Sequence, residues 1–260
     1  MEKPERKTYF YTVHGAAFGG RRLKPVVENL EARATAALPI TGGKVTAAAG
    51  GCGEGKIYSL SSASTELFGF EDPATGERTI NAESRVDGLK VLERVFTADR
   101  LVARLVLTNS REAEQPSVRL TGTEFVNVRI NGKPARIETY TEDFTRCATY
   151  SSLDRGCSEI IAGQYFWNGK APERRRTSGL PRHRAGYVPT SIVKNIAVEG
   201  NPFETFGHII HLPEFGWIHL GELQISEYGR RLTMFRMEGG SEEGFDLSGA
   251  DTRAHGHEFP

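Results

Sequence analysis

Hydrophobic and polar residues alternate along short segments over much of the chain, and turn-forming residues separate these segments. In the segment 217–226, the odd-numbered residues up to Gly221 would face one way and the even-numbered residues the other, which is the two-residue period of a β-strand. A turn at 227–229 joins this segment to an apolar run that contains Leu232, Met234 and Phe235. The pattern predicts an antiparallel hairpin with one buried face.

The same pattern of alternating segments and turns recurs earlier in the chain. The segment 86–107 predicts a hairpin that turns at 97–99, and 117–138 predicts another with Asn131-Gly132 in its two-residue turn. The segment 141–153 predicts the one helix, because acidic residues begin it and apolar residues recur at helical spacing. The predicted fold is therefore all-β, an antiparallel β-sandwich or flattened barrel with one short helix.

Size and composition fit this fold. The chain has 260 residues, 29 of them glycine and 12 proline, which suits short strands joined by many turns. We expect a single all-β domain over 1–260, with an irregular basic loop at 168–186 and a polar C-terminal tail at 239–260. The 33 acidic residues balance the 33 lysines and arginines, which argues against a dedicated nucleic-acid or membrane surface.

Cellular setting and cofactors can also be read from composition. Residues 1–8 are charged and lack the apolar region of a secretory signal, and no run of about 18 apolar residues occurs. Cys52, Cys147 and Cys157 show no CxxC spacing, so they indicate neither a disulfide framework nor a structural zinc site. We expect a cytoplasmic protein, and no cofactor is predicted.

Three stretches, 86–105, 125–138 and 203–237, carry short motifs at Thr97-Ala98-Asp99, Asn131-Gly132-Lys133-Pro134 and Leu220-Gly221-Glu222. In these motifs the chain resembles uncharacterised bacterial all-β proteins of the choice-of-anchor P family and their unanchored relatives. The resemblance implies a β-fold with this order of strands, and it implies no activity. This chain shows neither the secretion signal nor the surface anchor of the named members.

Histidines are the first candidates for chemistry, since five of the seven follow position 207. In a strand, His255 and His257 would project on the same face, as metal-binding histidines do in a cupin barrel, and Glu222 or Glu214 would complete a set of three ligands. The competing interpretation is that these histidines lie at the surface or make ordinary hydrogen bonds.

Acid–base chemistry is the second candidate. Glu93 lies among apolar neighbours, and with His219 and Glu222 it would form a catalytic set if the strands bring the three into one cavity. The competing interpretation puts Glu93 on the solvent face of its strand. Nucleophilic catalysis has less support, because there is no G-x-S-x-G motif.

The basic loop is a candidate surface for a partner. Its arginines would meet an acidic or phosphate-bearing partner, with the neighbouring Trp167 as an aromatic contact, although a solvated loop explains the same pattern. The partner-binding set comprises Arg174, Arg175, Arg176, Arg182, Arg184 and Trp167.

From these observations we expect a non-catalytic, cytoplasmic module that binds a protein partner or itself, as a homo-oligomer, through strand edges and the loop 168–186. The alternative is a small-molecule-binding β-barrel enzyme, cyclase- or isomerase-like, or metal-dependent like a cupin. It would use inward carboxylates and histidines.

Overall fold

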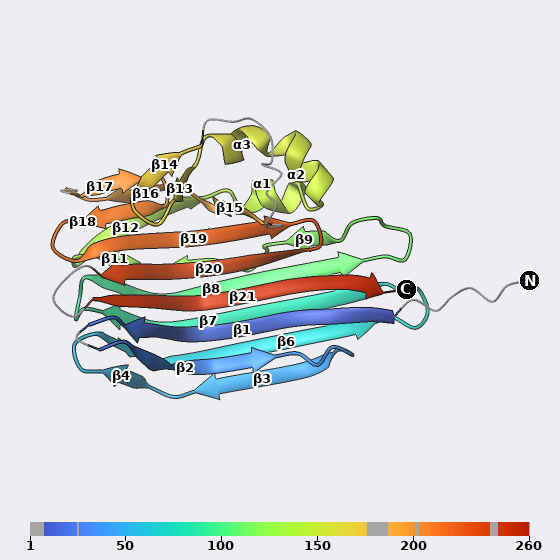
Figure 1. The fold of residues 1–260 in the computed structure, drawn as a ribbon, viewed down its shortest axis with the longest axis horizontal. Helices are drawn as coiled ribbons and strands as arrows, with labels where there is room; N and C mark the ends of the chain where they lie inside the picture. The colour runs from blue at the N-terminus through green and yellow to red at the C-terminus, as the bar shows by residue number, and fades with distance from the viewer. Residues whose placement is uncertain (1–7, 25, 176–186, 201–202, 240–243, 260) are drawn as a thin grey trace, which may run out of the picture.

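The structure is a computed structural model that describes residues 8–24, 26–175, 187–200, 203–239 and 244–259. Within these residues, long antiparallel strands run side by side in two stacked sheets, which we call sheet A and sheet B (Figure 1). The predicted all-β sandwich is confirmed, and the sheets do not close into a barrel.

Sheet A contains the C-terminal strands together with the first two. Its strand order is β17-β18-β19-β20-β21-β1-β2, and β15 pairs with the part of β19 that β18 leaves free. The strands are β17 (Glu204–Phe206), β18 (Ile209–Leu212), β19 (Gly216–Ser226), β20 (Gly229–Gly239), β21 (Phe245–Phe259), β1 (Thr8–Arg22), β2 (Glu28–Ala37) and β15 (Val188–Ser191).

Sheet B is built around the long β7–β8 hairpin. Its order is β16-β12-β11-β8-β7-β5-β4, with β9 and β10 also paired to β8, and β6 pairing with both β7 and β3. The strands are β3 (Gly43–Ala49), β4 (Cys52–Glu54), β5 (Tyr58–Leu60), β6 (Ser62–Glu71), β7 (Arg78–Val91), β8 (Phe96–Asn109), β9 (Ser117–Arg119), β10 (Glu124–Val126), β11 (Arg129–Ile130), β12 (Lys133–Thr139) and β16 (Val193–Val198).

The core lies between the two sheets, where alternate residues of each strand meet. Phe96 of sheet B stacks on Phe235 of sheet A with ring centroids 4.3 Å apart, and Phe18 packs on Tyr58 at 4.5 Å. The buried side chains form one continuous cluster that includes residues of both sheets. The predicted hairpin turns at 227–229 and at Asn131-Gly132 both form, and both residues of the latter have positive φ.

A row of irregular residues crosses sheet A and decides which side chains face outward. Regular pairing skips Gly221, Met234, Ala250, Ala17 and Ala34, which lie opposite one another on β19, β20, β21, β1 and β2. In β19, β21 and β1 the inward residues change from one parity to the other at this row. Alternation is therefore reversed from one side of the row to the other.

The helical region differs from the prediction. In place of one helix over 141–153 the chain forms α1 (Thr141–Arg146), α2 (Tyr150–Gly156) and α3 (Ser158–Ala162), at one edge of the sandwich (Figure 1). The break occurs because Thr149 caps α2 with a capping box to Ser152. None of the helices among the described residues has the length and apolar character needed to cross a membrane.

Two further predictions are wrong in position. The β7–β8 turn lies at 92–95 and not at 97–99, because Leu92 and Glu93 adopt the positive φ that reverses the chain. The expected polar tail is, in its described part, the strand β21, which lies between β20 and β1 near the middle of sheet A. Its inward positions include Gly249, Ala254 and Gly256, whose small side chains give a weak hydrophobic signal.

Candidate functional site

A pocket of about 380 Å³ lies against the outer face of sheet A. Its floor comes from β19, β20 and β21, and its aromatic wall comes from a two-stranded sheet of β13 (Tyr165–Trp167) and β14 (Pro172–Arg174), which we call the flap. The lining residues are Tyr165, Phe166, Trp167, Pro189, Thr190, His208, Glu222, Leu223, Gln224, Arg231, Thr233, Arg236, Asp246 and Ser248.

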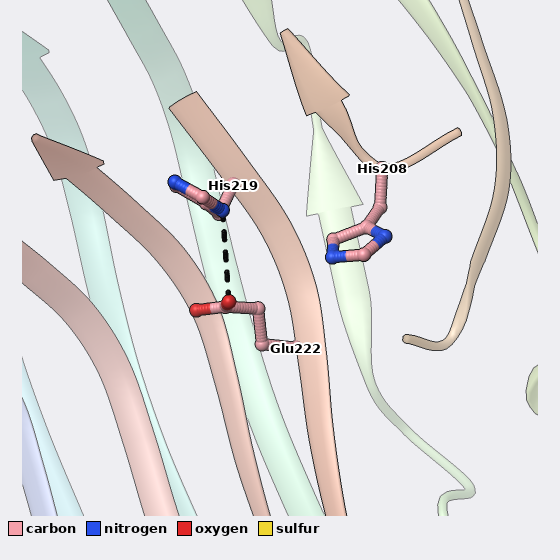
Figure 2. Close-up of side chains that lie close together, drawn as sticks. All are labelled: His208, His219 and Glu222. Atoms are coloured by element: carbon pink, nitrogen blue, oxygen red, sulfur yellow. Dashed lines mark ion pairs between the residues drawn. The ribbon is translucent and has the colours of Figure 1, made fainter. Parts of the chain in front are cut away.

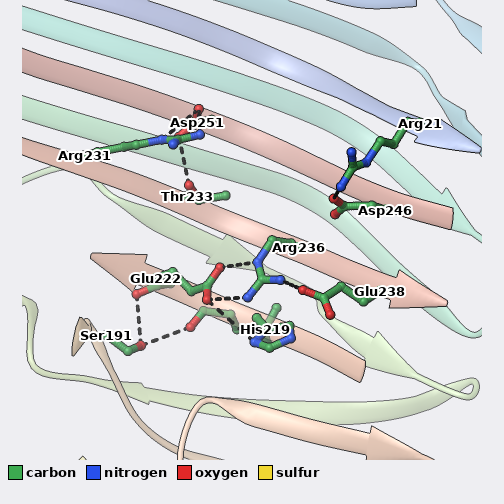
Figure 3. Close-up of polar contacts among 12 residues, drawn as sticks. Arg21, Ser191, His219, Glu222, Arg231, Thr233, Arg236, Glu238, Asp246 and Asp251 are labelled. Atoms are coloured by element: carbon green, nitrogen blue, oxygen red, sulfur yellow. Dashed lines mark hydrogen bonds and ion pairs between the residues drawn. The ribbon is translucent and has the colours of Figure 1, made fainter. Parts of the chain in front are cut away.

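Glu222 and Arg236 form the central ion pair of the floor (Figure 3). Arg236 donates from Nε to Glu222 Oε2 at 2.6 Å and from Nη2 to Oε1 at 2.7 Å, a bidentate geometry. Its Nη1 also pairs with Glu238. The two partners are largely buried, with side chains 23% and 21% exposed, so water screens this pair less than a surface pair.

Two buried histidines approach the carboxylate of Glu222 (Figure 2). His219 is fully buried, and its Nδ1 lies 3.6 Å from Glu222 Oε1. Trp167 of the flap covers it in a T-shaped contact, with ring centroids 5.3 Å apart. His208 precedes β18 and is 3% exposed, and its carbonyl accepts a hydrogen bond from the Leu220 amide at 3.0 Å.

The burial of these groups sets their charge. Desolvation lowers the pKa of His208 to about 4 and that of His219 to about 3, so both imidazoles are neutral at pH 7. Burial is the largest single influence on the pKa of Glu222 and would raise it, but the hydrogen bonds from Arg236 and the charge interactions with Arg236 and the two histidines together outweigh burial and hold this pKa at about 2. The inner end of the pocket, around Glu222, therefore presents one carboxylate, one guanidinium and two neutral imidazoles.

A buried glutamine holds the flap over the floor. Gln164 Nε2 donates to the Ser191 carbonyl at 2.8 Å, and the Ser191 amide donates to Gln164 Oε1 at 2.8 Å. Arg175 donates from its amide to the Gln164 carbonyl and from its guanidinium to the Pro189 carbonyl. The bonds from Gln164 to Ser191 and from Arg175 to Pro189 tie the base of the flap to β15, so the aromatic wall has a fixed position.

The structure brings together two of the three residues predicted for acid–base chemistry. His219 and Glu222 meet, while Glu93 lies in the β7–β8 turn, where its exposed side chain pairs with Lys56 at 3.2 Å. Glu93 is neither in the pocket nor on the solvent face of a strand, because the positive φ of Leu92 and Glu93 makes this segment a turn.

His255 and His257 share one face of β21, as predicted, with ring centroids 5.1 Å apart. They line a separate hollow of about 570 Å³ beside the loop 110–116. Within the described ranges neither belongs to a group of three candidate metal ligands. Glu222, expected as a third ligand for them, lies instead beside His219.

The predicted partner-binding residues are divided. Trp167 lines the pocket and contacts Trp217 at 5.0 Å, whereas Arg174 is exposed on β14. Arg175 is half-buried over the ring of Phe166, and desolvation lowers its pKa. Arg176, Arg182 and Arg184 lie outside the described residues.

Sequence reasoning missed His208 and Arg236 as parts of the site. A signal for Arg236 was available, because the predicted hairpin turning at 227–229 places it directly opposite His219. The position of His208 depends on the pairing of β18 with β19, in which Ile209 lies opposite His219.

Comparison with known proteins gives a family but no activity. A family model described as Domain of unknown function (DUF8256) matches residues 9–153 and 145–226, which together cover most of the chain. No curated protein and no solved structure matches. The resemblance to choice-of-anchor P family proteins stays a prediction.

Proposed function

Because the chain belongs to the family described as Domain of unknown function (DUF8256), we propose a function from the geometry of its own pocket. The flap pocket binds one small, neutral, hydroxyl-bearing molecule, such as a sugar ring. The observation that carries the proposal is the pairing of an aromatic flap with a floor of mutually neutralised charges. A volume of about 380 Å³ is near the lower end of the roughly 300–1,000 Å³ of small-molecule pockets, which favours a single small ligand.

The charges of the floor favour a neutral ligand. Two carboxylates and two guanidiniums line the pocket, and each is paired: Arg236 with Glu222, Arg231 with Asp251, and Asp246 with Arg21. A carboxylate, phosphate or ammonium group on an organic ligand would have to displace an existing partner to gain a counter-charge. A hydroxyl group can accept from a guanidinium and donate to a carboxylate without breaking either pair.

The flap supplies the complementary apolar surface. Tyr165, Phe166 and Trp167 line one side of the pocket, and Trp167 is held by its contacts with Trp217 and His219. A fixed indole gives a ligand a large flat contact at low entropic cost. A molecule with one apolar face and hydroxyls on its edges fits both walls.

The protonation states support binding rather than proton-transfer catalysis. Glu222, with a pKa of about 2, is a weak base. His208 and His219, with pKa values of about 4 and 3, are neutral at pH 7, where they are weak bases and hold no imidazolium proton to donate. Effective general acids and bases have pKa values near the working pH. This argument keeps the expectation of a non-catalytic binding module and gives it a small-molecule ligand.

Tryptophan fluorescence tests the proposal directly, because the chain has two tryptophans and both lie at the site. We expect neutral sugars or polyols to change the emission saturably, confirmed by calorimetry, and matched carboxylates, phosphates and amines to bind less tightly. Trp167→Ala should weaken calorimetric binding about 10-fold, roughly the ~1–3 kcal/mol of one aromatic stacking contact. Phe70→Ala, at an exposed aromatic outside the pocket, is the control. Tighter binding of charged compounds, or unchanged binding by Trp167→Ala, would refute the proposal.

We propose self-association as a second function. Val26 and Val27 are 71% and 66% exposed just before β2, the last strand in the order of sheet A. Among the described strands β2 pairs with β1 alone, and an unpaired strand edge beside exposed apolar residues is a surface on which a second copy can add its own strand. Light scattering during size-exclusion chromatography should show a dimer that Val27→Lys dissociates, and a strict monomer at high concentration would refute it. The cytoplasmic setting and a different protein partner stay predictions.

A further inference from the structure

The geometry points to a site for one divalent transition-metal ion, such as Zn²⁺ or Co²⁺, held by His208, His219 and Glu222 at the inner end of the flap pocket (Figure 2). One candidate ligand atom from each of these residues lies within 4.8 Å of the others. Two imidazoles and one carboxylate are a ligand set that proteins use for zinc and for non-haem iron, with further coordination positions left open.

His219 gives the strongest reason to expect a ligand. The side chain is completely buried, and neither ring nitrogen has a hydrogen-bond partner within the described part of the chain. A buried polar atom left without a partner costs about 1–3 kcal/mol. The three candidate ligand atoms converge, so one cation would coordinate one of these nitrogens together with His208 and Glu222.

The spacing of the atoms is close to that of a bound metal. With metal–nitrogen and metal–oxygen distances of about 2.0–2.2 Å, neighbouring ligand atoms of a tetrahedral site lie about 3.4 Å apart. His219 Nδ1 and Glu222 Oε1 are 3.6 Å apart and already meet this spacing. Since the largest separation in the group is bounded at 4.8 Å, movements of about an ångström complete the site.

Strand geometry holds the ligands in place. Residues three apart on a regular strand face opposite ways, but the positive φ of Gly221 reverses the alternation and puts His219 and Glu222 on one face. The hydrogen bond from the Leu220 amide to the His208 carbonyl fixes the third ligand to the same strand.

Arg236 is compatible with a metal on Glu222. A carboxylate has about four lone-pair sites, and the two hydrogen bonds from Arg236 take two of them. Arg236 then orients the carboxylate, as outer-shell partners do in metal sites. Because His208 and Glu222 line the pocket, the open coordination positions would face the ligand of the proposed function. The inference deepens that site, but it does not require a ligand to be bound.

The test is metal binding by the full chain, produced without a histidine tag and stripped with chelator. Calorimetry with Zn²⁺ and the visible spectrum of added Co²⁺ should show one equivalent bound. His208→Asn, His219→Asn and Glu222→Gln should each weaken binding by more than the ~10–100-fold that loss of an outer-shell partner costs. His211→Asn, on a neighbouring histidine that stacks on Trp217, and His255→Asn are matched controls that should bind normally.

The outcomes separate this inference from the proposed function. Circular dichroism identifies variants that do not fold, and His208→Asn, at a turn, serves if His219→Asn fails. Absence of stoichiometric metal, binding that survives both histidine substitutions, or loss of binding in His255→Asn would each overturn the site. Sugar binding followed by tryptophan fluorescence in chelator is independent of metal, so either proposal can fail while the other stands.

Discussion

Replacing Glu222 with glutamine removes the negative charge that Arg236 faces at the floor of the pocket. Glu222 accepts two hydrogen bonds from Arg236, at 2.6 and 2.7 Å, and both side chains are about one-fifth exposed. Glutamine keeps one acceptor oxygen but turns an amide NH₂ toward a guanidinium that can only donate. Arg236 keeps Glu238 as its one acidic partner in the described structure.

The expected loss of stability lies between two limits. Breaking a fully buried ion pair costs about 3–5 kcal/mol, and an exposed pair is worth about 0–1 kcal/mol. With partial exposure and a remaining partner at Glu238, we expect about 2 kcal/mol, in line with the ~1.5–3 kcal/mol of a hydrogen bond to a charged group. For a chain of this size, that corresponds to a fall in Tm of about 4–8 °C.

Urea unfolding at pH 7 in the presence of chelator measures this loss without a contribution from bound metal. The midpoint should fall while the denaturant slope stays constant. Glu66→Gln is the matched control, since Glu66 pairs with Lys44 at 3.0 Å and both side chains are half exposed. Its loss should stay below about 1 kcal/mol. If Glu222→Gln lost no more stability than Glu66→Gln, the ion pair would not hold the floor together and the reasoning would fail.

Three further predictions concern the same region. The first is a loss of stability in acid: as pH falls from 6.5 to 4 in chelator, His208 and His219 take up protons more readily in the unfolded chain than in the fold, where burial lowers their pKa values to about 4 and 3. The free energy of unfolding should therefore fall by roughly 2–3 kcal/mol per histidine. A flat profile in urea titrations over this pH range would contradict this. Gly221→Ala should lower the free energy of unfolding by at least about 1–3 kcal/mol through backbone strain, because φ at this position is +62° and the new Cβ would lie 2.6 Å from Ile192. A thermal melt as stable as that of the wild-type protein would contradict this. Gln164→Ala should loosen the flap, seen as red-shifted tryptophan emission and a loss of about 1–3 kcal/mol, and unchanged emission would show that the flap is held by other contacts.

The sandwich was predictable because strand alternation is a local property. Hairpins such as β19–β20 can be recognised in the sequence by alternating apolar residues on either side of a short turn. β21 failed this test because Gly249, Ala254 and Gly256 hold inward positions and give a weak hydrophobic signal. A Cβ at Gly256 would collide with the side chain of Tyr9 on the neighbouring strand β1, so no larger residue fits there. The α1–α2 boundary was missed because it depends on a capping box between Thr149 and Ser152 inside an otherwise helical pattern.

The site was only half predictable, for a reason that lies in Gly221. His219 and Glu222 were chosen for their chemistry, yet regular alternation places them on opposite faces of β19. A glycine inside a strand is a known sign of a bulge, so the sequence held a hint that the alternation changes there. Which residues the change brings together follows from pairing with β18 and β20, which one strand alone does not reveal.

The reversal of alternation explains why a carboxylate and a buried histidine can share this face at all. On a regular β19 that kept His219 outward, Glu222 would point between the sheets, where an isolated ionised carboxylate has a prohibitive desolvation cost. The row from Gly221 through Met234 and Ala250 prevents this, because the alternation reverses at matching positions of three neighbouring strands and their register is kept. Glu222 and Asp251 therefore both point outward, where each pairs with an arginine of β20. The floor of the pocket is thus a collective property of sheet A. A substitution that restores regular alternation in a single strand must therefore disturb the pairing of its neighbours as well as the site.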